Sequence, residues 1–309
     1  MKKSTGKNLL QVRTNPQFQY MNDHRTEQIF ALTLRLCIFI IFKKFKMQFS
    51  GQILKMISQN GQPIQYYLNL NNDLINLNQL FGKDLNIKHI GYQCVNCGSD
   101  EKIYRMGFCK KCFFESPYAS DTIIRPELST AHLGIAERDL EIEKEIQLVP
   151  HIVYLAYTGD VKVGVTRESQ IPTRWIDQGA TFALPIAVTE NRYEAGMIEL
   201  ELKKHIADKT NPKKMLLDDY EDTLDLIDFR NKIAAYFPND FKKFAVTEDN
   251  VVRLDFPYEK PEKINVFTLD KKPEFSGVLK GIKGQYLYFE GGDFINVRGH
   301  EGYVAELVV

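Results

Sequence analysis

The sequence predicts an α+β protein with three kinds of module: a four-cysteine zinc ribbon, a central α/β module with a small antiparallel sheet, and a β-rich terminal region. Three observations carry this prediction. Four cysteines occur as two C-x2-C pairs between residues 88 and 118. Residues 151–215 contain a strand–turn–strand pattern followed by a helical pattern. Alternating polar and apolar residues punctuated by glycine continue to Val309, which is typical of β-structure.

The composition indicates a globular chain without an overall bias in charge. The 309 residues are 44% hydrophobic, and 40 Lys and Arg balance 40 Asp and Glu, so the formal net charge is zero. A chain of this length can bury a real core and divide into two or three small domains. Because no overall positive field attracts the chain to nucleic acid, any nucleic-acid site must be local.

Residues 1–46 differ from the rest of the chain. The apolar run IFALTLRLCIFIIF at 29–42 contains Arg35 and is too short to span a bilayer, which needs about 20 apolar residues. A signal peptide is the alternative, but a polar stretch precedes the run and KKFK follows it in place of a cleavage site. We therefore expect residues 1–46 to be an extension outside the fold, with Met47 as the natural start. We also expect a cytoplasmic protein without a membrane partner.

The segment 47–90 predicts a β-rich beginning of the fold. It alternates polar and apolar residues and contains Asn60-Gly61, a hairpin signal. Two similar strand starts, FSGQILK at 49–55 and FSGVLKG at 275–281, lie near opposite ends of the chain. They reflect either similar strand-start chemistry or two chain ends that join in one small β-domain.

The cysteine pairs predict a metal site in the segment 91–118. CVNC at 94–97 and CKKC at 109–112 are separated by eleven residues, a spacing that lets four thiolates converge on one ion. Cys94, Cys97, Cys109 and Cys112 would form a closed, structural Zn²⁺ site with no open position for catalysis. Disulfides or free buried thiols are the alternative, but a chain without a convincing secretory signal keeps its cysteines reduced.

Two further segments flank the central module. Residues 119–150 are a polar, charged connector with a helix expected near 137–147. Residues 216–309 begin with a helical pair at roughly 219–237 and continue as a β-rich C-terminal region.

The central module, residues 151–215, begins with VYLAYTGDVKVGVTR at 153–167. Thr158-Gly159-Asp160 separates two strand-like runs, which predicts a hairpin. Gly164 would let substrate or neighbouring backbone approach closely. Asn191 and Glu194 have capping-box spacing, so we expect a helix from about 192 to 207 with a buried stripe formed by Ala195, Ile198, Leu202 and Ile206.

This module resembles the GIY-YIG nuclease domain, most of all the amino-terminal domain of UvrC-type excision nucleases. The resemblance lies in IVYLAYTGDVKVGVTR, then Arg174, then EAGMIE and KTNPKK, in this order. Each of the two motifs departs from it: Ile152-Val153 stand for the Gly-Ile of the first motif, and Lys162 replaces the Tyr of the second, as in some restriction enzymes of the superfamily. The ribbon ahead and GIKGQYL at 281–287 behind are similar to an uncharacterised bacterial family that combines a ribbon with such a domain.

The resemblance implies catalytic roles for four residues. Phosphodiester hydrolysis needs an activated water, neutralised phosphate oxygens and help for the leaving group. Tyr154 would accept a proton from water if the ammonium of Lys162 lowers its pKa from about 10. Arg174 would present a planar fork to the phosphate. Glu199 would bind one Mg²⁺ or Mn²⁺.

Two functions from different classes remain open. One is a metal-dependent, endonuclease-like phosphodiesterase acting on DNA or RNA. The other is a non-catalytic nucleic-acid- or protein-binding protein with a zinc ribbon on a nuclease-like scaffold. Under the second, each of the four residues is structural. Tyr154 is then an ordinary strand aromatic and Lys162 a solvated strand residue. Arg174 is a helix-start residue, and Glu199 is a partner of Lys203.

Overall fold

The structure is a computed structural model that describes residues 46–71, 73–206, 211–220 and 224–309. The predicted extension therefore lies outside the described residues, apart from Lys46. Residues Met47–Val309 fold as one unit. Several sheets, short helices and a four-cysteine cluster within this unit confirm the predicted α+β class. Within the described ranges, no helix combines the length and apolarity needed to cross a membrane.

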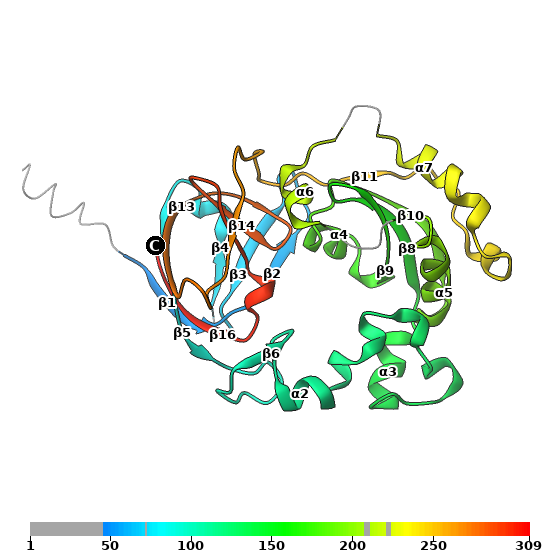
Figure 1. Cartoon of the computed structure of the whole chain (residues 1–309), viewed down its shortest axis with the longest axis horizontal. Coiled ribbons are helices and arrows are strands. Elements are labelled where there is room, and N and C mark those ends of the chain that lie inside the picture. Colours follow the sequence, from blue (N-terminus) through cyan, green and yellow to red (C-terminus); the bar gives the residue numbers. More distant parts are fainter. Residues whose placement is uncertain (1–45, 72, 207–210, 221–223) are drawn as a thin grey trace, which may run out of the picture. The chain divides into compact units, whose positions relative to one another are not determined.

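The β-rich module contains strands from both ends of this unit (Figure 1). Phe49 on the first strand pairs with Leu307 on the last, and the strand that contains Phe275 belongs to the same sheet. The hypothesis that the two similar strand starts join in one β-domain is confirmed. The sheet has the order β1 (Gln48–Gln52), β16 (Tyr303–Val308), β5 (Asp84–Tyr92), β13 (Glu274–Lys283), β14 (Tyr286–Phe289), β15 (Asp293–Asn296) and β12 (Asn265–Phe267).

A three-stranded sheet completes the β-rich module: β2 (Leu54–Gln59), β3 (Gln65–Asn69) and β4 (Leu74–Asn76). Asn60-Gly61 lies between β2 and β3, which pair antiparallel, so the predicted hairpin is confirmed. Met56 and Tyr66 are completely buried and belong to the same core as Leu279 of the larger sheet.

The ribbon and the connector follow β5. The ribbon contains β6 (Ile103–Arg105), β7 (Phe108–Cys109) and α2 (Lys110–Glu115). In the connector, α3 (Leu140–Gln147) lies where a helix was expected, and the Asp139 side chain caps it by accepting from two backbone N–H groups. The buried Glu143 carboxylate accepts from the N–H groups of Glu137, Arg138 and Asp139, which fixes the chain ahead of the helix.

The central module is built on a four-stranded sheet with the order β11 (Val252–Arg253), β10 (Phe182–Thr189), β8 (His151–Tyr157) and β9 (Val161–Arg167). Gly159 takes a φ of +90° in the turn between β8 and β9, so the predicted hairpin is confirmed. Strand β9 lies at the edge of the sheet. Side chains of the helices on both faces can therefore meet beside β9.

Four helices accompany this sheet: α4 (Thr173–Asp177), α5 (Arg192–Leu202), α6 (Pro212–Leu217) and α7 (Leu226–Ile233). The Asn191 side chain caps α5 as expected, although the helix ends at Leu202. Helices α5 and α7 pack on the face that contains Val153 and Leu155. The helical pair predicted at 219–237 begins earlier, because Asn211 caps α6 and Pro212 occupies its first turn.

Candidate functional site

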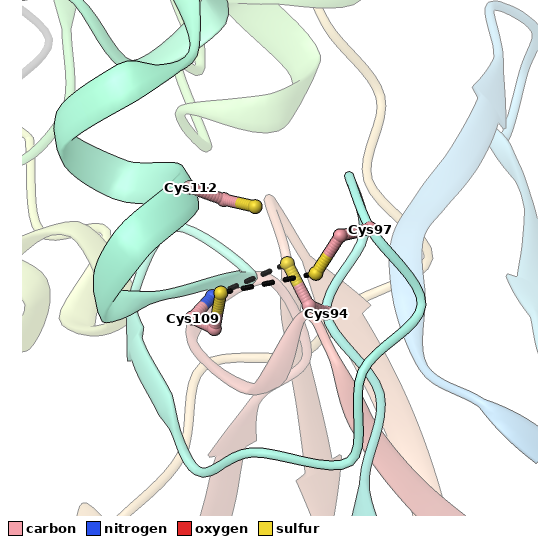
Figure 2. A group of neighbouring side chains, drawn as sticks. All are labelled: Cys94, Cys97, Cys109 and Cys112. Atoms are coloured by element: carbon pink, nitrogen blue, oxygen red, sulfur yellow. Dashed lines mark hydrogen bonds between the residues drawn. The ribbon is translucent and has the colours of Figure 1, made fainter.

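The four predicted metal ligands meet at one point in the ribbon (Figure 2). Their sulfur atoms all lie within 4.8 Å of one another, and Cys97 Sγ is 3.9 Å from Cys109 Sγ. A tetrahedral site with Zn–S bonds of about 2.3 Å places its sulfurs roughly 3.8 Å apart. The cluster fits a metal ion such as zinc.

Neighbouring groups stabilise these sulfurs. The Cys109 N–H donates to Cys94 Sγ at 3.3 Å, and Asn96 Nδ2 donates to Cys112 Sγ at 3.4 Å. Hydrogen bonding to Ser99 lowers the pKa of Cys97 to about 6, which favours the thiolate that binds metal. All four cysteines are free of disulfides.

Tyr154 lies in β8, on the sheet face that packs against α4. Its side chain is completely buried, and its ring meets Trp175 edge-on with centroids 5.9 Å apart. Gly164 is directly opposite in β9, where a Cβ atom would lie 2.7 Å from the Tyr154 hydroxyl oxygen. Gly164 therefore leaves space for the Tyr154 ring, where we expected substrate or backbone to approach.

Burial keeps Tyr154 a neutral phenol. Its hydroxyl donates to Gln178 Oε1 at 2.9 Å. Burial raises its pKa above the ordinary value; Arg174 opposes this effect and Glu199 adds to it. The expectation that the pKa of Tyr154 lies below its ordinary value is wrong, because desolvation of the buried ring is the largest effect. Lys162 is itself buried, opposite Ala156, so it is not a solvated strand residue either.

Arg174 and Glu199 both interact electrostatically with Tyr154, and their helices lie on opposite faces of the sheet. Arg174 is on α4 and lowers the pKa of Tyr154, whereas Glu199 is on α5 and raises it. Glu199 also lies two turns after Arg192 on the same helix face and stabilises its charge. Three of the four predicted residues, Tyr154, Arg174 and Glu199, are therefore close enough to interact electrostatically.

A cavity of about 340 Å³ lies beside β9 and α4. Arg174, alone among the four predicted residues, lines it. The cavity's one acidic side chain among the described lining residues, Asp177, forms an ion pair with Lys55. The cavity, called the basic cavity below, contains five cationic side chains: Lys55 of β2, Arg167 of β9, Arg174 of α4, Arg192 of α5 and Arg298 of the short helix η9 (Arg298–His300).

Hydrogen bonds hold the guanidinium of Arg192 close to those of Arg167 and Arg174. Its Nε donates to the Thr122 carbonyl at 2.8 Å and its Nη2 to that of Ile123 at 2.9 Å. Burial, opposed by Glu199, together with repulsion from Arg174 and Arg167 lowers the pKa of Arg192 to about 10, so it stays charged at neutral pH. An anion with several oxygens, such as a phosphate, would relieve this repulsion.

Four of the five cations of the basic cavity were not predicted from the sequence. Arg167 ends the second strand of the predicted hairpin and Arg192 begins the predicted helix. Their positions next to predicted site residues could have identified both arginines from the sequence. Lys55 and Arg298 lie near opposite ends of the fold, and no motif connects them to the central module.

Comparison with known proteins assigns a family. Residues 82–305 match the model of a family described as "Protein of unknown function (DUF2797)". The chain belongs to the DUF2797 family. No curated protein and no solved structure matches it.

The DUF2797 match includes the ribbon, the connector and the central module. The four arginines of the basic cavity lie inside the matched range, and Lys55 lies before it. The match ends within β16, so it also includes most strands of the larger sheet.

His151 of this DUF2797 protein lies close to the arginines. It is completely buried; Nδ1 donates to the Val149 carbonyl at 2.7 Å, and Nε2 has no hydrogen-bond partner among the described residues. Burial, reinforced by Arg192 and Arg167 and opposed by the bond to Val149, lowers its pKa to about 4. His151 is therefore neutral at physiological pH.

We expect His151 to make folding sensitive to acid. Its pKa is about 4 in the folded chain and about 6.5 when unfolded, so the unfolded state binds the proton first as pH falls. Its contribution is fully present above pH 6.5 and decreases by roughly 2–3 kcal/mol by pH 4.5. Urea unfolding at pH 7 and pH 4.5 measures this. His151→Asn can keep the donor to Val149 and should lose less stability between the two pH values; equal losses would contradict the assignment.

Proposed function

We propose that this DUF2797 chain is a metal-dependent phosphodiesterase that acts on DNA or RNA through a GIY-YIG-like site beside β9. The observation that carries the proposal is the basic cavity, where Arg167, Arg174 and Arg192 lie close together next to Tyr154 and Glu199. Phosphoryl oxygens gain charge as a phosphodiester is cleaved, and fixed guanidiniums in a partly buried site stabilise that charge.

In this proposal the residues divide the work. Arg174 and its neighbours bind and orient the phosphate, and Glu199 would hold Mg²⁺ or Mn²⁺. Such an ion would supply Lewis-acid catalysis and an acidic bound water. Tyr154, with its raised pKa, is a hydrogen-bonding group that positions Arg174 and the wall of the cavity, in place of the ready proton acceptor expected from the sequence.

The four-cysteine cluster has a separate role in this proposal. It binds one Zn²⁺ that stabilises the ribbon, and the closed ligand set leaves no position for substrate. Nucleic acid would bind in the basic cavity, either there alone or also on neighbouring surfaces.

One observation favours a second candidate function, binding of nucleic acid without cleavage. The neutral, completely buried Tyr154 is poorly suited to accept a proton. The same cavity would then hold a phosphate group and perform no reaction.

A gel assay with labelled single-stranded, duplex, flap and branched substrates tests the proposal. Wild type should cleave at least one of them only when Mg²⁺ or Mn²⁺ is added. Arg174→Lys keeps the charge but loses the planar fork, so cleavage should fall by about tenfold to a hundredfold. Arg230→Lys on α7, where Arg230 pairs with Asp249 outside the cavity, is the matched control and should cleave like wild type. Binding without cleavage of any substrate would support the second candidate.

A further inference from the structure

A second hollow adjoins the basic cavity. It has a volume of about 600 Å³ and lies between the β6–β7 turn of the ribbon and η9 of the β-rich module. Its lining includes Val95, Tyr104, Arg105, Met106, Arg298 and Glu301. We call it the ribbon groove. Arg298 lines both the basic cavity and the ribbon groove, so the two hollows are neighbours at this side chain.

The ribbon wall of this groove is an exposed aromatic surface. Tyr104 is 48% exposed and Met106 38% exposed, although both are large apolar side chains. The Tyr104 ring contacts Phe113 edge-on with centroids 5.2 Å apart and Phe114 with centroids 5.7 Å apart. These contacts hold Tyr104 in place, so a partner that stacks on it meets a rigid platform.

The charges of the ribbon groove suit a polyanion. Arg298 lies at the junction with the basic cavity, and Arg105 lies in the ribbon wall with its guanidinium over the Phe113 ring at 5.8 Å. The acidic residue in the described lining is Glu301, whose carboxylate already accepts from the Lys55 backbone N–H at 3.1 Å. The lining of the ribbon groove therefore combines cationic side chains with an exposed aromatic ring.

We propose that a single strand of nucleic acid leaves the basic cavity past Arg298, enters the ribbon groove and stacks a base on Tyr104. The choice of nucleic acid as ligand rests on the proposed function. Single strands fit because every unpaired base offers a face for stacking, whereas duplex bases are already stacked on one another. The ribbon would thereby select strandedness for the site in the central module.

Fluorescence anisotropy with a labelled twelve-nucleotide oligothymidylate and a duplex of equal length tests this path. The buffer contains neither divalent metal nor chelator, so that cleavage does not occur and the ribbon keeps its zinc. The single strand should bind more tightly than the duplex. Tyr104→Ala should weaken single-strand binding about 5- to 100-fold, and Tyr104→Phe should restore it because the ring is kept.

Two further variants complete the design. Arg298→Gln should weaken binding and reduce the salt dependence by about one phosphate contact. Tyr236→Ala removes an equally exposed tyrosine that stacks on His205 outside both hollows, and it should change nothing. Melting curves of the Tyr104 variants separate lost stacking from a misfolded ribbon. If Tyr104→Ala is misfolded, the comparison of Arg298→Gln with wild type decides the test.

Several outcomes would overturn the inference or separate it from the proposed function. Equal binding of single strand and duplex, or unchanged binding by both Tyr104→Ala and Arg298→Gln, would show that the strand does not use the groove. Self-association of the chain that Tyr104→Ala abolishes would assign the groove to a second copy. Cleavage by wild type with no effect of these variants would leave the proposed function standing without this path. Binding through Tyr104 without cleavage would support the path and refute the phosphodiesterase.

Discussion

Glu199→Gln is expected to lower metal-dependent cleavage by roughly a hundredfold or more while the fold stays intact. Gln keeps the size and helix propensity of Glu but lacks the charge that would bind Mg²⁺. Binding without added metal should stay the same or tighten, because a negative charge near Arg192 is removed. The free energy of unfolding should change by less than about 1 kcal/mol, since the side chain is only partly buried.

The matched control for this experiment is Glu201→Gln. Glu201 lies on the same helix but pairs with Lys204, three residues further on. The gel assay with both variants, with and without metal, separates the loss of a metal ligand from a general effect of charge on α5. If Glu199→Gln cleaved as fast as wild type, Glu199 would have no part in the mechanism, and the GIY-YIG resemblance would be one of fold alone.

Removal of zinc is expected to unfold the ribbon. The ribbon's own apolar cluster is small, consisting of Phe108, Ala119 and the partly buried Phe113 around the cysteines. Zinc binding in small metal-dependent domains contributes about 10–16 kcal/mol at pH 7, and this binding energy is also folding energy. Elemental analysis should find about one zinc per chain. A strong chelator, or Cys94→Ser, should make the segment 93–116 sensitive to protease.

The rest of the chain provides the internal reference. Tyr154 is buried in the core that also contains Met56 and Leu279, which is separate from the ribbon's apolar cluster, so Tyr154 should stay protected after zinc is lost. Replacement of Cys37, which lies outside the described residues, should leave the zinc content unchanged. Freshly purified protein without zinc, or a ribbon that resists protease equally with and without chelator, would contradict the zinc assignment.

Several features were predictable because they depend on neighbours in the sequence. The two C-x2-C pairs specify the cysteine cluster by spacing alone. The hairpin of β8 and β9 follows from two strand-like runs around Gly159, and the start of α5 follows from the Asn191 cap. In each case the residues that determine the structure lie within one turn or one loop of each other.

Other features of the candidate site depend on which distant segments pack together. Tyr154 was predictable as a strand residue of interest, but not its complete burial, and burial determines that its pKa rises. The burial of Lys162 was not predictable for the same reason, because alternation along β9 does not reveal that both faces of the sheet are covered. Desolvation is a property of the packed structure, so a sequence pattern cannot supply it.

The sequence by itself determined the α+β class, the cysteine cluster and the hairpin–helix order of the central module, since spacing and periodicity act through local hydrogen bonds and local geometry. Only the tertiary structure decided that Lys55 and Arg298 of the β-rich module join Arg167, Arg174 and Arg192 around one cavity. A chain with zero net charge can contain such a basic site because electrostatic potential depends on distances in space, and folding brings five cations together with Asp177 as the one acidic side chain among the described lining residues.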